Sequence, residues 1–377
     1  MQTMHPTLLI GPSDWDPRQI PREDYDVRRA ALWRDHDNAG GAIIYGDSRS
    51  HAALAYFTHF TPKLEAAMAL IPRRGEPQML IGGGVNMLPA AKPLTFITDL
   101  APLRSAAKSA ADWARGLEAG TNLVLIGGEA MPNDLRHALD RALGDGVRVK
   151  SGDASLQTHM RRKSPHELRM LREACAILDV TAAELCRAAR SGAGVADCIV
   201  KAEYAALRRG AQDVRSLFSL DGGRTLRPFN IPIAQSHDPL QVYLAVRHNG
   251  YWADGFVRVA NDELQRKAET VLHNMVAEIK AGLPCRRLAQ IADAGRGMLR
   301  PHPLADGTFG SSIGLSLDEP PFLTRDDGTM LEQDAVYSLR AGLIDDSGMG
   351  AIVSSMVAVT AQGAEILWPT GPIGERS

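Results

Sequence analysis

The stretch Gly310-Ser311-Ser312-Ile313-Gly314-Leu315-Ser316-Leu317-Asp318-Glu319-Pro320-Pro321 is the most informative part of the chain. Its centre, Gly314–Leu317, predicts a short strand, and the acidic pair and prolines that follow predict a turn. Asp318 and Glu319 are adjacent, so on extended backbone their side chains point to opposite faces. We therefore expect only one of these two carboxylates to line any cavity beside the strand.

A second stretch, Gly250-Tyr251-Trp252-Ala253-Asp254-Gly255-Phe256-Val257-Arg258, places an acid directly after a turn with two aromatic residues. Together, the two stretches resemble the creatinase, prolidase and methionine aminopeptidase family. The resemblance implies a pita-bread fold, whose cavity usually holds two metal ions on five side chains.

Further segments extend the resemblance over about Met160 to Trp368, in the order and spacing of that family. They are Lys163-Ser164-Pro165-His166-Glu167 at a helix start, Lys280-Ala281-Gly282-Leu283-Pro284 at a helix end, and Val357–Leu367 at a final hairpin. In the first half, Leu54–Phe60 is similar to a segment of the creatinase and prolidase branch. In that branch the segment reaches across a dimer into the partner's active site, so the resemblance also implies a homodimer.

The five metal ligands of the family can be placed on this sequence one at a time. The resemblance puts Tyr243 at the first aspartate, Asp254 at the second, Ser311 at the histidine, and Arg340 and Ser354 at the two glutamates. Two dications need carboxylates to offset their charge, and a guanidinium repels a metal at close range. We therefore expect no metal and no other cofactor. We also expect Arg340 to occupy the vacated site and to pair with Asp254.

The resemblance assigns the remaining site residues. Asp318 falls on an inward-facing histidine of the family. The family's proton-shuttling histidine falls on Phe229, and His237 is the nearest alternative position, although its surroundings also suit a surface turn. The predicted catalytic residues are Asp254, Asp318, Glu319, Tyr243 and Arg340, and the predicted substrate-binding residues are Arg227, Phe229, His237, Tyr251, Ser311 and Ser354.

Structural roles are the alternatives for two of these residues. Asp254 is also suited to be a structural partner of Arg340 or Arg258. Tyr243 is also suited to fill the space left by the metal. If the acids instead lie together near an apolar wall, their pKa values are pushed apart, which suits acid–base catalysis.

Helical and strand-like patterns divide the chain into two domains. Residues 1–155 alternate between the two, which predicts an α/β domain similar to the creatinase and prolidase N-terminal domain. Residues 156–377 are predicted to be an α+β pita-bread domain, with helices packed on a largely antiparallel sheet. Its first helix starts with a capping box, Ser164 and Glu167, around Pro165. Its predicted strands are Leu217–Leu220, Val242–Val246, Gly255–Val259, Gly314–Leu317, Val336–Leu339 and Val353–Val359.

Composition argues against several classes of partner. The chain has 377 residues, of which 23% are charged, and a formal net charge of −2, which gives nucleic-acid or membrane binding no electrostatic support. Its apolar runs are far shorter than the roughly 20 residues that a membrane helix needs, and we expect no signal peptide. The four cysteines have no C-x-x-C spacing, which predicts reduced thiols in a cytoplasmic protein.

The resemblance and the altered ligands together predict a metal-independent hydrolase of a small C–N substrate of amide, amidine or lactam type. Creatinase is the precedent for hydrolysis without metal in this fold, although it uses a histidine that this chain lacks. A lyase or isomerase with the same acid–base residues is one alternative, and a non-catalytic pita-bread binding protein is another. A metalloaminopeptidase with relocated ligands is a third. The expected partners are a small-molecule substrate and a second copy of the chain.

Overall fold

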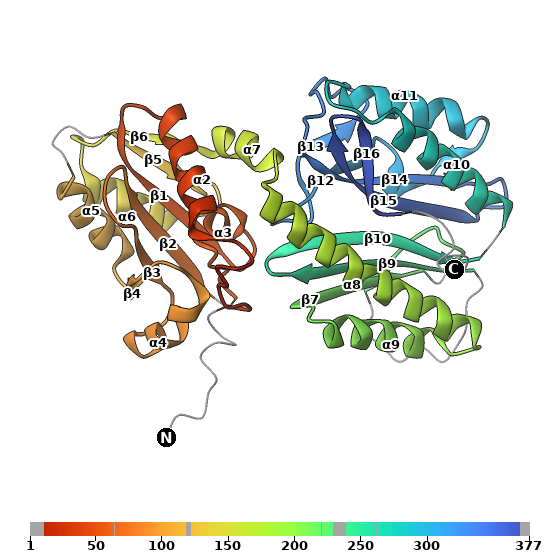
Figure 1. Cartoon of the computed structure of the whole chain (residues 1–377), viewed down its shortest axis with the longest axis horizontal. Coiled ribbons are helices and arrows are strands. Elements are labelled where there is room, and N and C mark those ends of the chain that lie inside the picture. Colours follow the sequence, from red (N-terminus) through yellow and green to blue (C-terminus); the bar gives the residue numbers. More distant parts are fainter. Residues whose placement is uncertain are drawn as a thin grey trace. The chain divides into compact units, whose positions relative to one another are not determined.

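A computed structural model describes residues 11–63, 65–117, 122–219, 221–228, 239–260 and 262–369 (Figure 1). The chain divides into two compact units, Met1–Met160 and Arg161–Ser377. This division falls within helix α7 (Asp153–Arg161), whereas the sequence predicts a boundary after residue 155. Within the described residues, the structure contains no helix long and apolar enough to cross a membrane.

The N-terminal unit is built on one six-stranded sheet in the order β4-β3-β2-β1-β5-β6. Its strands are β1 (Ala39–Asp47), β2 (Ala66–Pro72), β3 (Gln78–Ile81), β4 (Asp99–Pro102), β5 (Asn122–Ile126) and β6 (Val149–Ser151). Its helices are α2 (Arg22–Asp35), α3 (Ala52–Thr58), α4 (Leu88–Ala91), α5 (Ala106–Arg115) and α6 (Asn133–Leu143), with short 3-10 turns η1 (Val85–Met87) and η2 (Lys92–Leu94). Strand β1 pairs antiparallel with β2 and parallel with β5, so the unit is a mixed α/β domain, as predicted.

The C-terminal unit begins with the long helix α8 (Pro165–Arg190). Ser164 Oγ accepts a hydrogen bond from the Glu167 N–H, and the Glu167 side chain accepts one from the Ser164 N–H. The predicted capping box is therefore confirmed. Helix α8 packs on strands β9 and β10, and α9 (Val195–Arg208) packs on α8 and β7.

Two antiparallel sheets form the rest of this unit. The first has the order β10-β9-β7-β8, and the second has the order β13-β12-β14-β15-β16, with β11 paired to β14. The first contains β7 (Asp213–Phe218), β8 (Arg227–Pro228), β9 (Leu240–His248) and β10 (Tyr251–Val259). The second contains β11 (Arg300–Pro301), β12 (Thr308–Ser312), β13 (Glu319–Thr324), β14 (Val336–Ile344), β15 (Gly350–Thr360) and β16 (Gly363–Trp368). Helices α10 (Glu263–Glu278) and α11 (Cys285–Arg296) pack on the second sheet, and the 3-10 turn η3 (Pro303–Ala305) precedes β12.

The predicted strand at Gly314–Leu317 is wrong. Strand β12 ends at Ser312, and Gly314–Leu317 forms a bent loop. Within this loop the Gly314 N–H donates to the Ser316 carbonyl, and the Ser316 N–H donates to Glu319 Oε1. These local hydrogen bonds satisfy polar groups that, in a strand, would pair with the backbone of a neighbouring strand. The apolar pattern alone does not distinguish the two structures.

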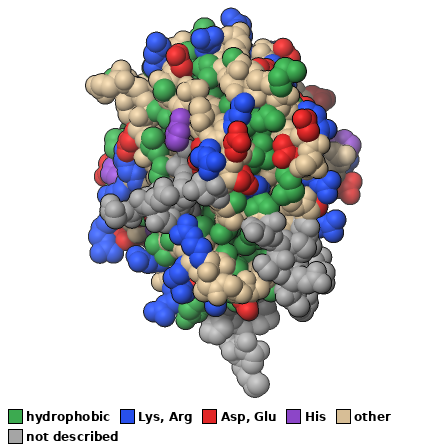
Figure 2. All heavy atoms as spheres, turned by 90° about the vertical axis from the view of Figure 1, so that its right-hand side faces the viewer, with side chains coloured by type: hydrophobic (Ala, Val, Ile, Leu, Met, Phe, Trp, Pro, Cys, Tyr) green, Lys and Arg blue, Asp and Glu red, His purple; other side chains and the backbone are tan. Residues whose placement is uncertain are grey.

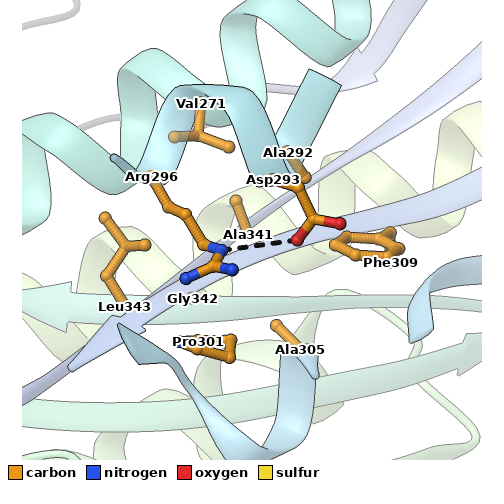
Figure 3. A pocket seen from close by; sticks show the side chains of 10 residues that line it. All are labelled: Val271, Ala292, Asp293, Arg296, Pro301, Ala305, Phe309, Ala341, Gly342 and Leu343. Carbon is orange, nitrogen blue, oxygen red and sulfur yellow. Dashed lines mark hydrogen bonds and ion pairs between the residues drawn. The ribbon is translucent and has the colours of Figure 1, made fainter. Parts of the chain in front are cut away.

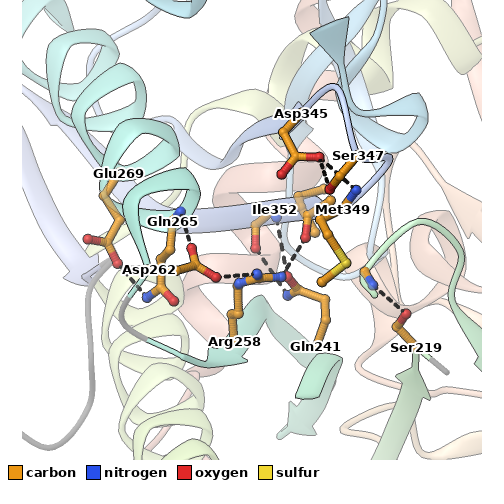
Figure 4. A network of polar contacts seen from close by, with 12 residues as sticks. Ser219, Gln241, Arg258, Asp262, Gln265, Glu269, Asp345, Ser347, Met349 and Ile352 are labelled. Atoms are coloured by element: carbon orange, nitrogen blue, oxygen red, sulfur yellow. Dashed lines mark hydrogen bonds and ion pairs between the residues drawn. The ribbon is translucent and has the colours of Figure 1, made fainter. Parts of the chain in front are cut away.

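Hydrogen bonds between strands of the two sheets hold the sheets together. The Gln241 side chain on β9 donates to the carbonyls of Val257 and Ile352 and accepts from the Ile352 N–H. Nearby, the buried Arg258 guanidinium donates to the Gly350 carbonyl and to Asp262, the N-cap of α10 (Figure 4). At the other end of β10, the Trp252 N–H donates to the carbonyl of Gly314, in the loop after β12.

Charges of both signs are interspersed on the face of the molecule shown in Figure 2. This distribution agrees with the near-zero net charge of the sequence. The four cysteines are buried free thiols. Burial raises the pKa of the Cys186 thiol to about 11, so this thiol is protonated at neutral pH.

Candidate functional site

The candidate site lies where β10 of the first sheet crosses β15 of the second. The Asp254 N–H contacts Met356 Sδ at 3.4 Å, and the Phe256 N–H donates to Ser354 Oγ at 2.7 Å. Side chains alternate along a strand, so Trp252, Asp254 and Phe256 share one face of β10, while the N–H groups of Asp254 and Phe256 point from its free edge to β15. Tyr243 lies on the same face, because it is paired directly with Phe256.

Asp254 is the central acid of this site and is 9% exposed. Its Oδ2 accepts a hydrogen bond from the Tyr243 hydroxyl at 3.0 Å, and its buried Oδ1 has no hydrogen-bonding partner within the described chain. Burial raises the pKa of Asp254 to about 6. The nearby hydroxyls of Ser338 and Tyr243 lower this pKa, the charge of Asp318 raises it, and that of Arg340 lowers it. Asp254 therefore changes its charge close to neutral pH.

Tyr243 supplies a neutral donor to that acid. Its ring is half-buried, with its centroid 5.0 Å from that of Phe256. Burial, and then the charge of Asp254, raise the pKa of Tyr243 well above its usual value. The hydroxyl therefore stays protonated over the whole physiological pH range and can donate a hydrogen bond to Asp254.

Asp318 and Ser311 form a second acid–hydroxyl pair in the same site. The Ser311 hydroxyl, on β12, donates to Asp318 Oδ1 at 2.8 Å. Asp318 is close enough to raise the pKa values of both Asp254 and Tyr243. The structure therefore brings together two carboxyl groups and two hydroxyl groups that the sequence places in the site.

The predicted ion pair between Arg340 and Asp254 is not formed. Arg340 is half-buried, and its Nε donates to the Thr308 carbonyl at 3.3 Å. Its charge still lowers the pKa values of Asp254 and Tyr243, so it faces the site without direct contact. The physical reason is that the Arg340 Nε–H is held by the Thr308 carbonyl of its own sheet, while Tyr243 donates to Asp254 Oδ2.

Glu319 forms an ion pair that involves neither Asp254 nor Asp318. Its Oε2 lies 2.8 Å from Lys163 Nζ, and the two side chains are only 7% and 2% exposed. Its Oε1 accepts the Ser316 N–H. The predicted catalytic role of Glu319 is therefore replaced by a structural one, since its carboxylate is held in place at both oxygens.

Two predicted substrate-binding residues point away from Asp254. Tyr251 lies on the opposite face of β10, where its hydroxyl donates to Glu167 Oε1 on α8 at 3.1 Å. Arg227 is exposed on the edge strand β8, paired with Phe218. Ser354 lies inside the site, but its hydroxyl oxygen already accepts the Phe256 N–H.

Phe229 and His237 lie outside the described residues. Ser338 was missed from the sequence, although its hydroxyl lowers the pKa of Asp254. It could have been found, because Ser338 and Arg340 are two residues apart on one strand and so share a face.

The donor set in the described part of the site does not fit the metal pair that the resemblance implies. No group of three His, Cys, Asp or Glu side chains among the described residues could hold a metal ion. Asp254 Oδ1 is one carboxylate oxygen that accepts no hydrogen bond within the described residues. The Tyr243 and Ser311 hydroxyls donate to carboxylates, and Arg340 brings a positive charge. Two dications need several anionic ligands, which these groups do not provide.

A small pocket lies elsewhere in the unit, between β14 and helices α10 and α11 (Figure 3). It encloses about 270 Å³ when the open space at its mouth is counted. Ala341 and Leu343 line it, and they lie on the opposite face of β14 from Arg340. Asp293 at its rim is already paired with Arg296 and Arg325. This pocket is therefore separate from the candidate site.

Known proteins with similar sequences or folds share this architecture. The chain is 25% identical over 233 residues to "Putative dipeptidase YkvY" of Bacillus subtilis (strain 168), an alignment that covers 59% of the chain and 64% of that relative. The X-Pro aminopeptidase of Thermotoga maritima MSB8 superposes with a TM-score of 0.75 and 17% identity, covering 92% of this chain and 97% of the other. The Xaa-Pro dipeptidase of Bacillus anthracis gives 0.73 and 17%, over 91% and 97%.

These folds confirm the predicted pita-bread architecture with an α/β N-terminal domain. The family model for metallopeptidase family M24 matches residues 169–361, which is more than half of the chain. The matched region contains Tyr243, Asp254, Ser311, Arg340 and Ser354, so the ligand positions lie within it. The chain belongs to metallopeptidase family M24, a family of peptidases that hydrolyse C–N bonds.

Proposed function

We propose that this chain is a metal-independent hydrolase of small C–N substrates of amide, amidine or lactam type. The observation that carries the proposal is the buried Asp254, whose pKa is about 6 and whose Oδ1 is free of hydrogen bonds among the described residues. A general base is most effective when its pKa lies near the working pH.

In the proposed reaction, Asp254 Oδ1 takes a proton from a water molecule while the water oxygen attacks the substrate carbon. A C–O bond forms, and the carbonyl or amidine π electrons move onto the substrate heteroatom. The Arg340 guanidinium stabilises the negative charge that develops there. Asp254, now protonated, returns the proton to the leaving nitrogen as the C–N bond breaks.

The two hydroxyl groups hold the acids in place during this cycle. Tyr243 donates to Asp254 Oδ2, which leaves Oδ1 to face the water. Ser311 holds Asp318 at 2.8 Å. The negative charge of Asp318 favours the protonated form of Asp254 and so helps to retain the proton until the nitrogen accepts it.

A non-catalytic binding protein is the second candidate function. It is favoured by the packing of the Tyr243 ring against Phe256, which fills part of the space that a metal site would need. The same packing supports catalysis if it orients the hydroxyl, so activity must be measured directly.

The test is an amine-release screen with protein stripped of metal by a chelator and checked for metal content. The substrates are dipeptides, N-acyl amino acids, guanidino acids and lactams. Asp254→Asn should lower any rate by roughly 10²–10⁴-fold, whereas Asp346→Asn, on an exposed loop, should leave it unchanged. Turnover that requires added metal, or that survives Asp254→Asn, would contradict the proposal. Complete absence of turnover would favour the binding protein.

A further inference from the structure

Helix α9 carries a row of apolar side chains on its outer face. Val200, Tyr204 and Leu207 follow one another at intervals of four and three residues, so they share one face of the helix. Their exposed fractions are 53%, 59% and 56%. No other helix in the described ranges carries more than one large apolar side chain that is exposed. The row is therefore a concentrated apolar patch rather than a set of scattered residues.

The opposite face of α9 accounts for its packing within the C-terminal unit. Its buried residues pack on α8 and β7, and they are Val195, Cys198, Ile199, Ala202 and Ala206. In Figure 1 the helix lies along the edge of this unit. A surface helix normally presents a polar face opposite its buried one, so an apolar outer face indicates a partner.

Charges of opposite sign lie at the two ends of the row. Asp197 is in the first turn of α9 and Arg208 is in the last turn, and both are exposed. They are seven and four residues from Tyr204, so all three share one face. Arg208 stacks on the Tyr204 ring, 5.8 Å from its centroid. Within the described chain, neither Asp197 nor Arg208 forms an ion pair.

A second copy of α9 in antiparallel orientation matches this order of side chains. A two-fold axis that places Asp197 of one copy beside Arg208 of the other forms the same ion pair at both ends. The same register places Lys201, which is exposed, beside the Tyr204 ring of the other copy. A cation over an aromatic ring is attracted to it. A parallel arrangement would instead bring like charges together.

The apolar residues also meet in this arrangement. Val200 and Leu207 lie seven residues apart, which is close to two turns, so they occupy the same flank of the row. In an antiparallel pair related by a two-fold axis, equal flanks of the two helices face each other. Apolar surface therefore covers apolar surface, while the opposed helix dipoles attract.

We propose that the outer face of α9 is an interface between two copies of this chain, paired antiparallel about a two-fold axis. This interface is separate from the segment Leu54–Phe60, through which the resemblance implies a homodimer. It does not depend on hydrolysis at Asp254. A helix of 14 residues is only about 21 Å long. The contact is therefore smaller than a standard interface, and association should be reversible and depend on concentration.

The first experiment measures the weight-average mass of the full chain by sedimentation equilibrium over a range of concentrations. The mass of the wild type should rise towards twice its value at low concentration. Leu207→Glu should weaken this association roughly tenfold or more, because it buries a charge without a partner. The matched control is Ile366→Glu on β16, where the isoleucine is 50% exposed, and it should associate like the wild type.

The second experiment reverses the charges at the ends of the row. Asp197→Arg or Arg208→Asp alone should weaken association, because like charges then meet at both ends. The two changes together restore opposite charges and should recover association, as should an equimolar mixture of the two single variants. Circular dichroism checks that each variant is folded. If a reversal prevents folding, Asp197→Asn and Arg208→Gln remove the same charges and should each weaken association.

The interface is overturned if the mass of the wild type is constant up to about 1 mM, which is the limit for a weak complex. It is also overturned if Leu207→Glu and Ile366→Glu associate alike. If the single charge variants lose association and the double variant does not recover it, the antiparallel pairing of two copies is wrong.

Discussion

The Tyr243 hydroxyl donates a hydrogen bond to Asp254 Oδ2 over 3.0 Å, joining the two residues that the sequence resemblance puts at the aspartate ligand positions of the metallopeptidase family. This bond lowers the pKa of Asp254 against the effect of burial. Tyr243→Phe should therefore move the acid limb of the activity profile to higher pH, because a less stabilised carboxylate holds its proton longer. The measurement is the pH dependence of kcat/KM. Tyr337→Phe, a buried tyrosine of β14, is the control, and an acid limb unchanged by Tyr243→Phe would contradict the assigned role.

The second prediction concerns stability and pH. The pKa of Asp254 is about 6 in the folded chain, against a usual value of 3.8. Between these values the folded state binds more proton than the unfolded state, so stability should fall as the pH rises from about 4 to about 6. The loss amounts to roughly 2–3 kcal/mol.

Asp254→Asn removes this titration. The free energy of unfolding of the variant, relative to that of the wild type, should therefore be higher at pH 7 than at pH 4. The free energy of unfolding in urea, measured at several pH values, gives the difference. If the difference in unfolding free energy between the two proteins does not vary with pH, the prediction is wrong. Loss of the Asp254 carboxylate should not leave Arg340 without a partner, since Arg340 Nε donates to the Thr308 carbonyl.

A third prediction concerns the buried ion pair of Lys163 and Glu319. Lys163→Met should destabilise the fold by several kcal/mol (~3–5), because it leaves a carboxylate that is 7% exposed without its partner. Adding Glu319→Gln should recover part of that loss. The control is Arg172→Met, which breaks an exposed pair with Glu365 and should cost at most about 1 kcal/mol. Equal costs for the two single substitutions, by urea denaturation, would show that Lys163 and Glu319 do not depend on each other.

The fourth prediction restores the metal ligands that the family carries. Tyr243→Asp, Ser311→His, Arg340→Glu and Ser354→Glu together remove the guanidinium and supply carboxylate and imidazole donors around Asp254. Cobalt should raise the melting temperature of this quadruple variant, since a ligand that binds only the folded state stabilises it. The wild type should show no such rise after chelator treatment. A similar rise in the wild type would mean that it already holds a metal site.

The sequence predicted the elements of the fold well, because their signals are local. The capping box at Ser164 and Glu167 correctly starts α8, and the predicted strands Val336–Leu339 and Val353–Val359 lie within β14 and β15. Gly314–Leu317 was misassigned because its backbone bonds are satisfied inside a loop. A run of apolar residues carries no information about such bonds.

The candidate site was predicted in part. Asp254, Tyr243, Asp318 and Ser311 do come together, three of them on β9, β10 and β12 and Asp318 in the bend before β13, as the family resemblance implies. The hydrogen-bonding partner of Asp254 could not be predicted from the sequence, since the side chains of both Tyr243 and Arg340 can reach toward an acid. Which one bonds to Asp254 depends on side-chain packing between the two sheets.

The two sheets are tied at both ends, by Gln241 and Arg258 at one and by the bond from the Trp252 N–H to Gly314 at the other. These bonds fix the separation of the two sheets, so a substrate bound at Asp254 is selected by its size and stiffness rather than by movement of the sheets around it. A ring compound gives up less internal rotation on entry than an open chain of equal size. Cyclic amides should therefore be favoured over linear ones for a purely entropic reason.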